Sequence, residues 1–264
     1  MRFVKAHADG NDFLLVPEAE AHGDPAALAR RLCDRHRGIG ADGLILFRER
    51  PGGASMRLLN ADGSRAEVSG NGARCLAAWV LHARGEGSAP VIVETDAGAI
   101  AFEPLGRDGS RLRFRAAMTP PEGLELRDLD AAGRRLRVAV MRVGNPQCVA
   151  LVGRDDMSLE TLGALGPALS QHPAFPEGTN VEIATVEAPD RVRILIWERG
   201  VGPTASSGTG ACAAAVAAIA YGGAGRNLEV LAPGGAQRVE WTPDGRLFLT
   251  GWAELLCEGR WLPR

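Results

Sequence analysis

The chain has 264 residues, of which 45% are hydrophobic and 23% charged, and its formal net charge at pH 7 is −2. This length allows one large domain or two of about 130 residues, each able to bury a hydrophobic core. Basic and acidic residues are interleaved along the sequence, so no basic face is available for nucleic acid or an anionic membrane, and neither is expected as a partner.

Five cysteines are scattered along the chain, an odd number without a Cys-x-x-Cys pair. This pattern argues against a disulfide framework or a zinc site and favours a reducing compartment. The N-terminal sequence MRFVKAHADGNDF lacks the apolar run of a signal peptide, and the most apolar stretch, residues 211–221, is too short to span a bilayer. We therefore expect a soluble, cytoplasmic protein.

The first half of the chain is predicted to contain short strands and two helices. Asp24 followed by Pro25 is typical of the N-cap and first residue of a helix. A second helix is expected after Ser69, with Gly85 as its C-cap and with Cys75, Leu76, Trp79 and Val80 on one stripe. Strands are expected at residues 2–7, 13–16, 56–59, 91–95, 99–103 and 111–115, and a buried strand within GIGADGLILF.

The segment 118–126 contains paired prolines and is interpreted as a boundary, after which the order of elements repeats. Strands are expected at residues 136–142, 148–152, 180–185 and 191–198, with helices in SLETLGALGPALS and after Ser207 and a hairpin turn at Asp244-Gly245. Many short strands with one long apolar helix per half predict an α+β unit, in which a curved sheet wraps around a buried helix.

Two glycine-rich segments echo each other, NADGSRAEVSGNGARC at 60–75 and ERGVGPTASSGTGAC at 198–212. A single Ser-Gly-x-Gly at a helix start is common capping chemistry, whereas two matched copies indicate a ligand site. The free N–H groups of two buried helix N-termini then face one small anion. Neither copy ends in Gly-Lys-Ser/Thr, which excludes a Walker-type phosphate loop.

The motifs resemble those of the diaminopimelate epimerase family of cofactor-independent amino-acid racemases and epimerases. Besides the two segments, HADGNDF, GIGADGLI, NADGS, ETDAG, VGNPQ, EGTNVE and ERGVG occur in family order over nearly the whole chain. The resemblance implies two pseudo-symmetric halves, each with a curved mixed or antiparallel sheet around a central helix, and an active site in the cleft between them. The halves are expected at 1–117, completed by about 253–264, and at 118–252. It also implies a homodimer that acts in lysine biosynthesis.

In this family each half supplies one cysteine at the helix start. One is the thiolate base and the other the thiol acid on opposite faces of the substrate Cα, so LL- and meso-diaminopimelate interconvert without pyridoxal phosphate or a metal. Ser69 and Ser207 occupy these two catalytic positions here. A thiol suits this role because its pKa of about 8.5 is lowered at a helix N-terminus. A serine hydroxyl is a far weaker acid, so reduced turnover is expected.

Three further departures cluster with the serines: Gln147 stands where the family usually has histidine, Pro203 where it has glutamate, and HADGND replaces HGLGND. The substrate-binding positions match instead. The resemblance places Asn11 near the reacting amino group and assigns the reacting carboxylate to Gly70, Asn71, Gly208 and Thr209. It assigns the distal amino-acid end to Asn60, Asn145, Asn180, Glu198 and Arg199. Asn60 and Asn180 have the alternative of serving turns.

Three functions remain open. The first is a diaminopimelate epimerase, or a form of one in which both cysteines were changed to serine to trap substrate. The second is a diverged isomerase or epimerase acting on another amino acid. The third is a non-catalytic paralogue that binds an amino acid. Cys75 and Cys212 are expected to pack in the core, and His7 to be structural.

Overall fold

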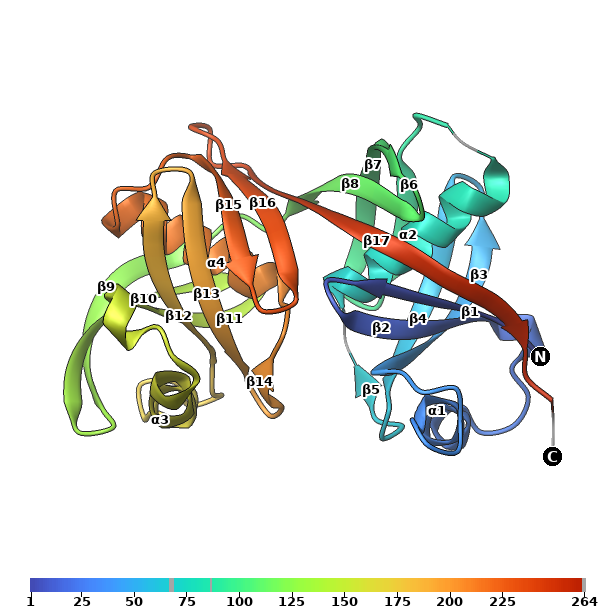
Figure 1. Ribbon diagram of the computed structural model, residues 1–264, viewed down its shortest axis with the longest axis horizontal. Coiled ribbons are helices and arrows are strands. Elements are labelled where there is room, and N and C mark those ends of the chain that lie inside the picture. The colour runs from blue at the N-terminus through green and yellow to red at the C-terminus, as the bar shows by residue number, and fades with distance from the viewer. Residues whose placement is uncertain (67–68, 86, 263–264) are drawn as a thin grey trace. The chain divides into compact units, whose positions relative to one another are not determined.

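The computed structural model describes residues 1–66, 69–85 and 87–262, and has an α+β fold with four α-helices among these residues. The chain divides into two compact units (Figure 1). Unit 1 comprises Met1–Ala116 and Gly251–Arg264, and unit 2 comprises Ala117–Thr250. The last strand, β17 (Leu247–Arg260), begins in unit 2 and continues into unit 1.

In unit 1, eight strands close into a ring in the order β1-β2-β3-β4-β6-β7-β8-β17, with β17 pairing back to β1. A short strand, β5, pairs with the second half of β4. The elements are β1 (Arg2–Ala8), β2 (Asn11–Pro17), the 3-10 helix η1 (Glu18–Glu20), α1 (Pro25–Cys33), β3 (Gly43–Arg50), β4 (Gly53–Asn60), β5 (Arg65–Ala66), α2 (Gly70–Arg84), β6 (Val91–Thr95), β7 (Gly98–Asp108) and β8 (Arg111–Met118).

Helix α2 lies inside this ring, whereas α1 covers its outside (Figure 1). Alternation along β2 and β3 explains the two layers, because Phe13 and Ile45 face α2 while Leu14 and Leu44 face α1. Ten of the fifteen residues of α2 are buried, so the helix is packed against the surrounding strands on nearly all sides.

In unit 2, a curved sheet runs in the order β9-β10-β11-β12-β13-β15-β16-β17, with β14 paired to β13. Its pairs are antiparallel except β11–β12 and β13–β15. The elements are β9 (Glu122–Ala131), β10 (Arg134–Val143), β11 (Asn145–Leu151), the 3-10 helix η2 (Arg154–Asp156), α3 (Leu159–Ser170), β12 (Asn180–Ala188), β13 (Arg191–Glu198), β14 (Gly202–Thr204), α4 (Gly208–Tyr221), β15 (Asn227–Ala232) and β16 (Gly235–Trp241).

Helices α4 and α3 cover opposite faces of the unit 2 sheet. Neighbouring residues of β11 divide between them, since Val149 packs in the α4 core and Cys148 in the α3 core. Helix α4 is built largely of alanine, and nine of its residues are buried. Such small side chains let the surrounding strands approach the helix closely.

The predicted fold class is confirmed, with one curved sheet around one buried helix in each unit. Asp24 caps α1 by accepting hydrogen bonds from Ala26 and Ala27, and Gly85 ends α2 with a φ of 66°. Of the predicted stripe, Trp79 is only partly buried. Within the expected boundary segment 118–126, β8 ends at Met118 and β9 starts at Glu122.

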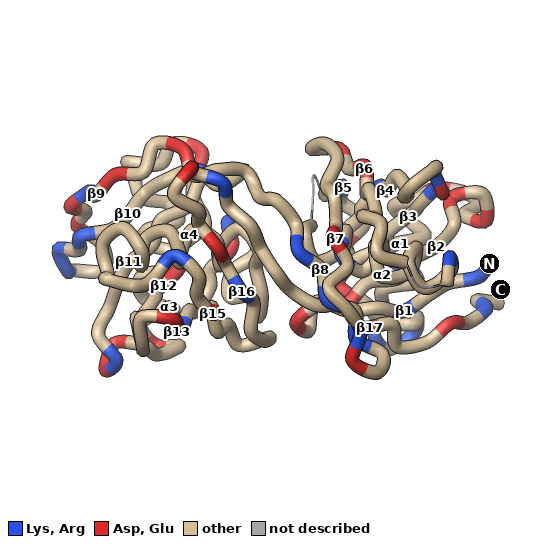
Figure 2. Tube along the Cα trace, turned by 90° about the horizontal axis from the view of Figure 1, so that it is seen from above, with Lys and Arg blue, Asp and Glu red and all other residues tan. Residues whose placement is uncertain are grey.

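Charges of both signs are interleaved along the strands of each unit (Figure 2). On β9 and β10 they form local ion pairs, such as Arg137 with Asp128 at 3.0 Å. Within the described parts of the chain, no helix is both long and apolar enough to span a membrane.

Candidate functional site

The two predicted catalytic serines occupy the same structural position, the N-cap of the buried helix of their unit. Ser69 Oγ accepts a hydrogen bond from the N–H of Gly72 at 3.1 Å at the start of α2. Ser207 Oγ accepts one from the N–H of Gly210 at 3.2 Å at the start of α4. Each hydroxyl therefore satisfies one orphan N–H of its helix and keeps its own proton available as a donor.

The first turn of α4 carries further donors. In the described structure, the N–H groups of Gly208 and Thr209 take no acceptor, while that of Ala211 bonds the carbonyl of Ser207 at 3.0 Å. Unsatisfied N–H groups at a helix N-terminus, together with the helix dipole, favour an anion. The corresponding residues of α2 are Gly70 and Asn71, and the Asn71 side chain accepts from Arg74 at 3.4 Å.

Asn11 belongs to a charged cluster at the start of β2. Its Nδ2 donates to Asp42 Oδ2 at 2.8 Å, and Asp42 in turn binds Arg35. Burial acts to raise the pKa of the neighbouring Asp12, but hydrogen bonds from Arg35 and Lys5 lower it to about 2. The Asn11 side chain is thus held by an ionised network.

Asn60 and Asn180 both make turn contacts. Asn60 Nδ2 donates to Ser64 Oγ at 2.9 Å, and Asn180 Oδ1 accepts from the backbone N–H of Arg199 at 2.9 Å. Arg199 also donates from its guanidinium to the carbonyl of Glu177 at 2.7 Å. The turn interpretation is therefore supported for both asparagines. A role in binding substrate remains a prediction.

A polar chain links other predicted residues at the α4 end of unit 2. Gln147 lies 2.6 Å from Asn145 Oδ1 and 3.2 Å from Thr209 Oγ1. Ser207 Oγ lies 3.4 Å from Thr209 Oγ1. The fold therefore brings together the side chains of Asn145, Gln147, Thr209 and Ser207, with Gln147 in contact with two of the predicted site residues.

Glu182, a fully buried glutamate on β12, was not among the site residues expected from the sequence. Burial, with a smaller contribution from Glu198, raises the pKa of Glu182 to about 8. Burial likewise raises the pKa of Glu198, the last residue of β13. One signal was available, because strand alternation places Glu182 on the same face as Asn180 and Ala184, and Ala184 packs in the α4 core.

Two of the positions that depart from the family pattern, Asp9 and Pro203, affect the backbone. Asp9 is fully buried with a positive φ of 52°, and its carboxylate lies 3.7 Å from the buried guanidinium of Arg74. Pro203 is exposed within β14, opposite Trp197. Proline removes a backbone donor without harm where that donor faces solvent.

The thiols do not replace the missing cysteines. Cys75 and Cys212 are fully buried in the cores of their units, as expected. Burial also raises the pKa of Cys75 far above its ordinary value, which disfavours a thiolate. His7 has structural contacts, since its Nδ1 accepts from the N–H of Gly10 at 3.3 Å and its ring packs with Trp252 in a T-shaped arrangement, with centroids 5.2 Å apart.

The side chains of the chain can be compared with what pyridoxal phosphate or a metal ion would require. Lys5 is the only lysine of the sequence, and its ammonium lies 2.7 Å from Asp12 and donates to the carbonyl of Gly40. A Schiff base with pyridoxal phosphate would need this amine, which is already held in an ion pair. Among the described residues, no three His, Cys, Asp or Glu side chains are grouped to hold a metal ion.

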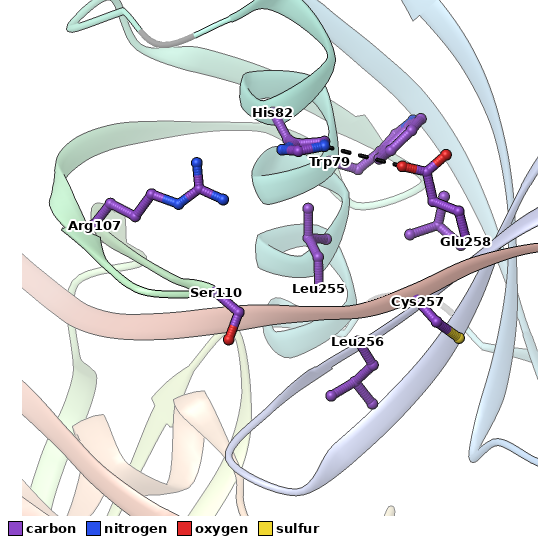
Figure 3. Close-up of a pocket in the computed structure, with 9 residues that line it drawn as sticks. Trp79, His82, Arg107, Ser110, Leu255, Leu256, Cys257 and Glu258 are labelled. Atoms are coloured by element: carbon purple, nitrogen blue, oxygen red, sulfur yellow. Dashed lines mark ion pairs between the residues drawn. The ribbon is translucent and has the colours of Figure 1, made fainter.

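A surface pocket of about 170 Å³ lies elsewhere in unit 1 (Figure 3). It is formed by the C-terminal part of α2, the β7–β8 hairpin and β17, and His82 pairs with Glu258 at its wall at 3.9 Å. The described residues that line it include none of the predicted site residues. It is therefore separate from the serine at the other end of α2.

Comparison with known proteins identifies the family. The diaminopimelate epimerase family profile matches residues 3–119 and 139–256. The chain is 41% identical to diaminopimelate epimerase of Desulforudis audaxviator (strain MP104C) over an alignment 285 positions long, which covers 99% of each protein. Two solved structures share the fold at 18% identity. A predicted epimerase from Pseudomonas aeruginosa has a TM-score of 0.73, with 100% of this chain and 99% of that one covered. A hydroxyproline epimerase from Agrobacterium vitis has a TM-score of 0.66, with 98% and 90% covered. The chain therefore belongs to the diaminopimelate epimerase family of isomerases.

Proposed function

We propose that this chain is a pyridoxal-phosphate-independent amino-acid epimerase that interconverts LL- and meso-diaminopimelate by proton transfer at Cα, using Ser69 and Ser207. The observation that carries the proposal is the repeat of a serine N-cap at the start of both buried helices. Family membership over nearly the full chain supports the substrate.

The two helix starts have the chemistry that this reaction needs. Removing an α-proton places negative charge on the adjacent carboxylate, and free N–H groups such as those of Gly208 and Thr209 stabilise such charge. Their contribution does not depend on the residue at the cap. We therefore expect substrate binding and stabilisation of the carbanion to persist in the serine form.

The acid–base step is where the serine form is weak. A general acid or base contributes about 10²- to 10⁴-fold to rate when its pKa suits the operating pH. The pKa of a serine hydroxyl is far from the operating pH, and each cap hydroxyl already accepts a hydrogen bond from its own helix. The proposed turnover is accordingly slow relative to a thiol pair.

The remaining predicted residues are proposed as the substrate grip. Asn11 would meet the reacting amino group, and Asn60, Asn145 and Asn180 the distal end, with Glu198 and Arg199. An arginine on a carboxylate and oxygen acceptors around an ammonium suit a second amino-acid group. We further propose a cytoplasmic homodimer acting in lysine biosynthesis, for which light scattering on the purified protein tests the dimer.

The test is deuterium incorporation at Cα in D2O with LL- or meso-diaminopimelate, followed by proton NMR, with calorimetric binding measured on the same preparation. Slow exchange with binding is the expected result. Binding without exchange would instead favour a second candidate, a non-catalytic amino-acid-binding protein, for which the engagement of both hydroxyls as caps is the supporting observation. If neither binding nor exchange is observed, diaminopimelate is refuted as the substrate, and an isomerase acting on another amino acid is favoured.

A further inference from the structure

The two units differ at one equivalent spot beneath the first turn of the buried helix. Gly72 and Gly210 are each the third residue after the cap serine. A Cβ on Gly72 would lie 3.0 Å from Ile45 Cδ1 and 3.4 Å from the ring of Phe13. A Cβ on Gly210 would lie 2.5 Å from Glu182 Oε1 and 3.2 Å from Ser207 Oγ.

The strands confirm that these positions correspond. Phe13 lies two residues after Asn11 on β2 and pairs with Gly43, two residues before Ile45. In unit 2, Gln147 lies two residues after Asn145 on β11 and pairs with Asn180, two residues before Glu182. The fold therefore accepts an apolar pair at this spot in unit 1, so packing alone does not require the buried Glu182–Gln147 pair of unit 2.

Gln147 lies between Glu182 and the residues that line the start of α4. One end of its amide is 3.1 and 3.3 Å from the two carboxyl oxygens of Glu182. The other end is 2.6 Å from Asn145 Oδ1 and 3.2 Å from Thr209 Oγ1. Because a glutamine amide has a donor end and an acceptor end, its orientation must follow what Glu182 offers.

Each protonation state of Glu182 selects one orientation. A carboxylate only accepts, so it draws the NH2 of Gln147, and the amide oxygen then receives a hydrogen bond from the Thr209 hydroxyl. Because Asn145 Oδ1 only accepts, the Asn145 amide must turn as well, so that its NH2 faces the Gln147 oxygen. A protonated carboxyl donates to the amide oxygen instead, and the NH2 of Gln147 then donates to Asn145 Oδ1. In the second state the Thr209 hydroxyl keeps its own proton for a ligand.

The groups around Glu182 favour the protonated state. Glu198 on β13 adds a like charge, and on β11 the nearby Cys148 has its pKa raised by burial and by Glu182 itself. Helix α4 contributes the uncharged hydroxyls of Ser207 and Thr209, and the positive end of its dipole acts in the opposite direction by favouring the carboxylate. Among the described residues, no lysine, arginine or histidine forms an ion pair with Glu182. Burial, with a smaller contribution from the like charge of Glu198, outweighs the dipole and raises the pKa of Glu182 to about 8.

We propose that Glu182 is a positioning residue of the α4 site: its proton sets the orientation of the Gln147 amide and so leaves the Thr209 hydroxyl free to donate to an anionic ligand group. The ligand's identity rests on the proposed function, but the amide switch does not. Ionisation of Glu182 removes this donor and adds a nearby negative charge, and both changes weaken carboxylate binding.

The switch is tested first without a ligand, by following glutamine side-chain NH2 signals in 15N–1H spectra between pH 6 and pH 10. One pair, identified by its loss in Gln147→Leu, is expected to shift with a midpoint near pH 8. The shift should be absent in Glu182→Gln and retained in Glu187→Gln, the same change at a solvent-side position of the same strand. A Gln147 signal that does not titrate, or that titrates equally in Glu182→Gln, would overturn the proposal.

Binding of LL-diaminopimelate is then measured by calorimetry at pH 7 and pH 9. If only the protonated state binds, affinity should be about tenfold weaker at pH 9, because the competent fraction falls by that factor across a midpoint of 8. Glu182→Gln should lose most of this dependence. The double variant Gln147→Phe with Glu182→Ile, which copies unit 1, should fold and be equally independent of pH. An unchanged pH dependence in both variants would refute Glu182 as its source. Absence of binding at every pH, with the NMR switch intact, would count against the proposed substrate alone.

Discussion

The Oγ atom of Ser207 accepts the N–H of Gly210 at 3.2 Å, and the same bond recurs in the other unit between Ser69 and Gly72 at 3.1 Å. A residue that caps a helix contributes to stability whatever its role in catalysis. The two roles can therefore be separated by substitution.

Removing a cap hydroxyl should destabilise the protein. Ser69→Ala and Ser207→Ala are each expected to lower the free energy of unfolding by about 1 kcal/mol, because one N–H of the first turn loses its acceptor. Urea unfolding followed by circular dichroism measures this change. Ser69→Gly is the matched control, since glycine at an N-cap costs only a few tenths of a kcal/mol. Equal stability of the alanine variants and the parent would contradict the capping role.

Restoring thiols should restore fast proton transfer. Ser69→Cys combined with Ser207→Cys is expected to increase Cα deuterium exchange on diaminopimelate by about 10²- to 10⁴-fold, the usual contribution of a matched general acid or base. Proton NMR in D2O measures the rate. Ser158→Cys, at the serine cap of α3, is the control for an added thiol and should leave exchange unchanged. No gain in the double variant would rule out the serines as the acid–base positions.

A methyl group on Gly210 should act through Glu182. Gly210→Ala places its Cβ 2.5 Å from Glu182 Oε1, so the carboxyl must move and stability should fall by about 1–3 kcal/mol. Gly70→Ala meets nothing within 4 Å and is the matched control. Combining Gly210→Ala with Glu182→Ala should relieve the clash, with a coupling of about 0.5–3 kcal/mol in a double-mutant cycle. Additive effects would show that the two residues do not interact.

Stability should decrease as the pH rises above about 5. Burial raises the pKa of Glu182 from 4.5 to about 8, so between these values the folded state binds a proton that the unfolded state releases. The free energy of unfolding then falls with pH, with a limiting slope of about 1.4 kcal/mol per pH unit, until Glu182 ionises near pH 8. Urea titrations at pH 5 to 9 should show this slope reduced in Glu182→Gln. An identical slope in both proteins would contradict the raised pKa.

Protonation of Asp12 should lower the free energy of unfolding at acidic pH, so that stability there rises with pH, opposite to the effect of Glu182. Although burial opposes ionisation, hydrogen bonds from Arg35 and Lys5 lower the pKa of Asp12 from 3.8 to about 2. Stability from this network is present above pH 3.8 and is lost as the pH falls toward 2, by about 2 kcal/mol. Asp12→Asn should flatten this acid limb, measured by thermal unfolding at pH 2 to 5. A limb of unchanged depth in the variant would assign it to other carboxyl groups.

Local chemistry was the part of the fold that the sequence predicted well. Ser-Gly-x-Gly followed by an apolar run carries its own cap, and Asp24-Pro25 does the same for α1, so both helix starts are found where expected. The strand β15 was missed because NLEVLA is short, and its place depends on a parallel pairing with β13. Nothing within six residues specifies such a partner.

Glu182 was missed for a related reason. Its motif EGTNVE was recognised, yet a glutamate on a strand is ordinarily assigned to the solvent face. Its burial arises from the pairing of β11 with β12 and from the absence of a side chain on Gly210, 28 positions further along the chain. Contacts between residues so far apart follow only from the assembled sheet.

The strand β17 also orders events during synthesis. Its first residues pair with β16, whereas residues from Glu254 onward pair with β1 and complete the ring of unit 1. A ribosome that has made the first 250 residues has therefore produced every strand that unit 2 contains, while the older N-terminal unit still awaits its final strand. Until then β1 lacks its β17 partner and exposes an edge that can pair with another chain. The strand ring of unit 1, whose first strands are synthesised earliest, is thus completed last. Truncation after Thr250 should therefore yield a protein that aggregates through unit 1.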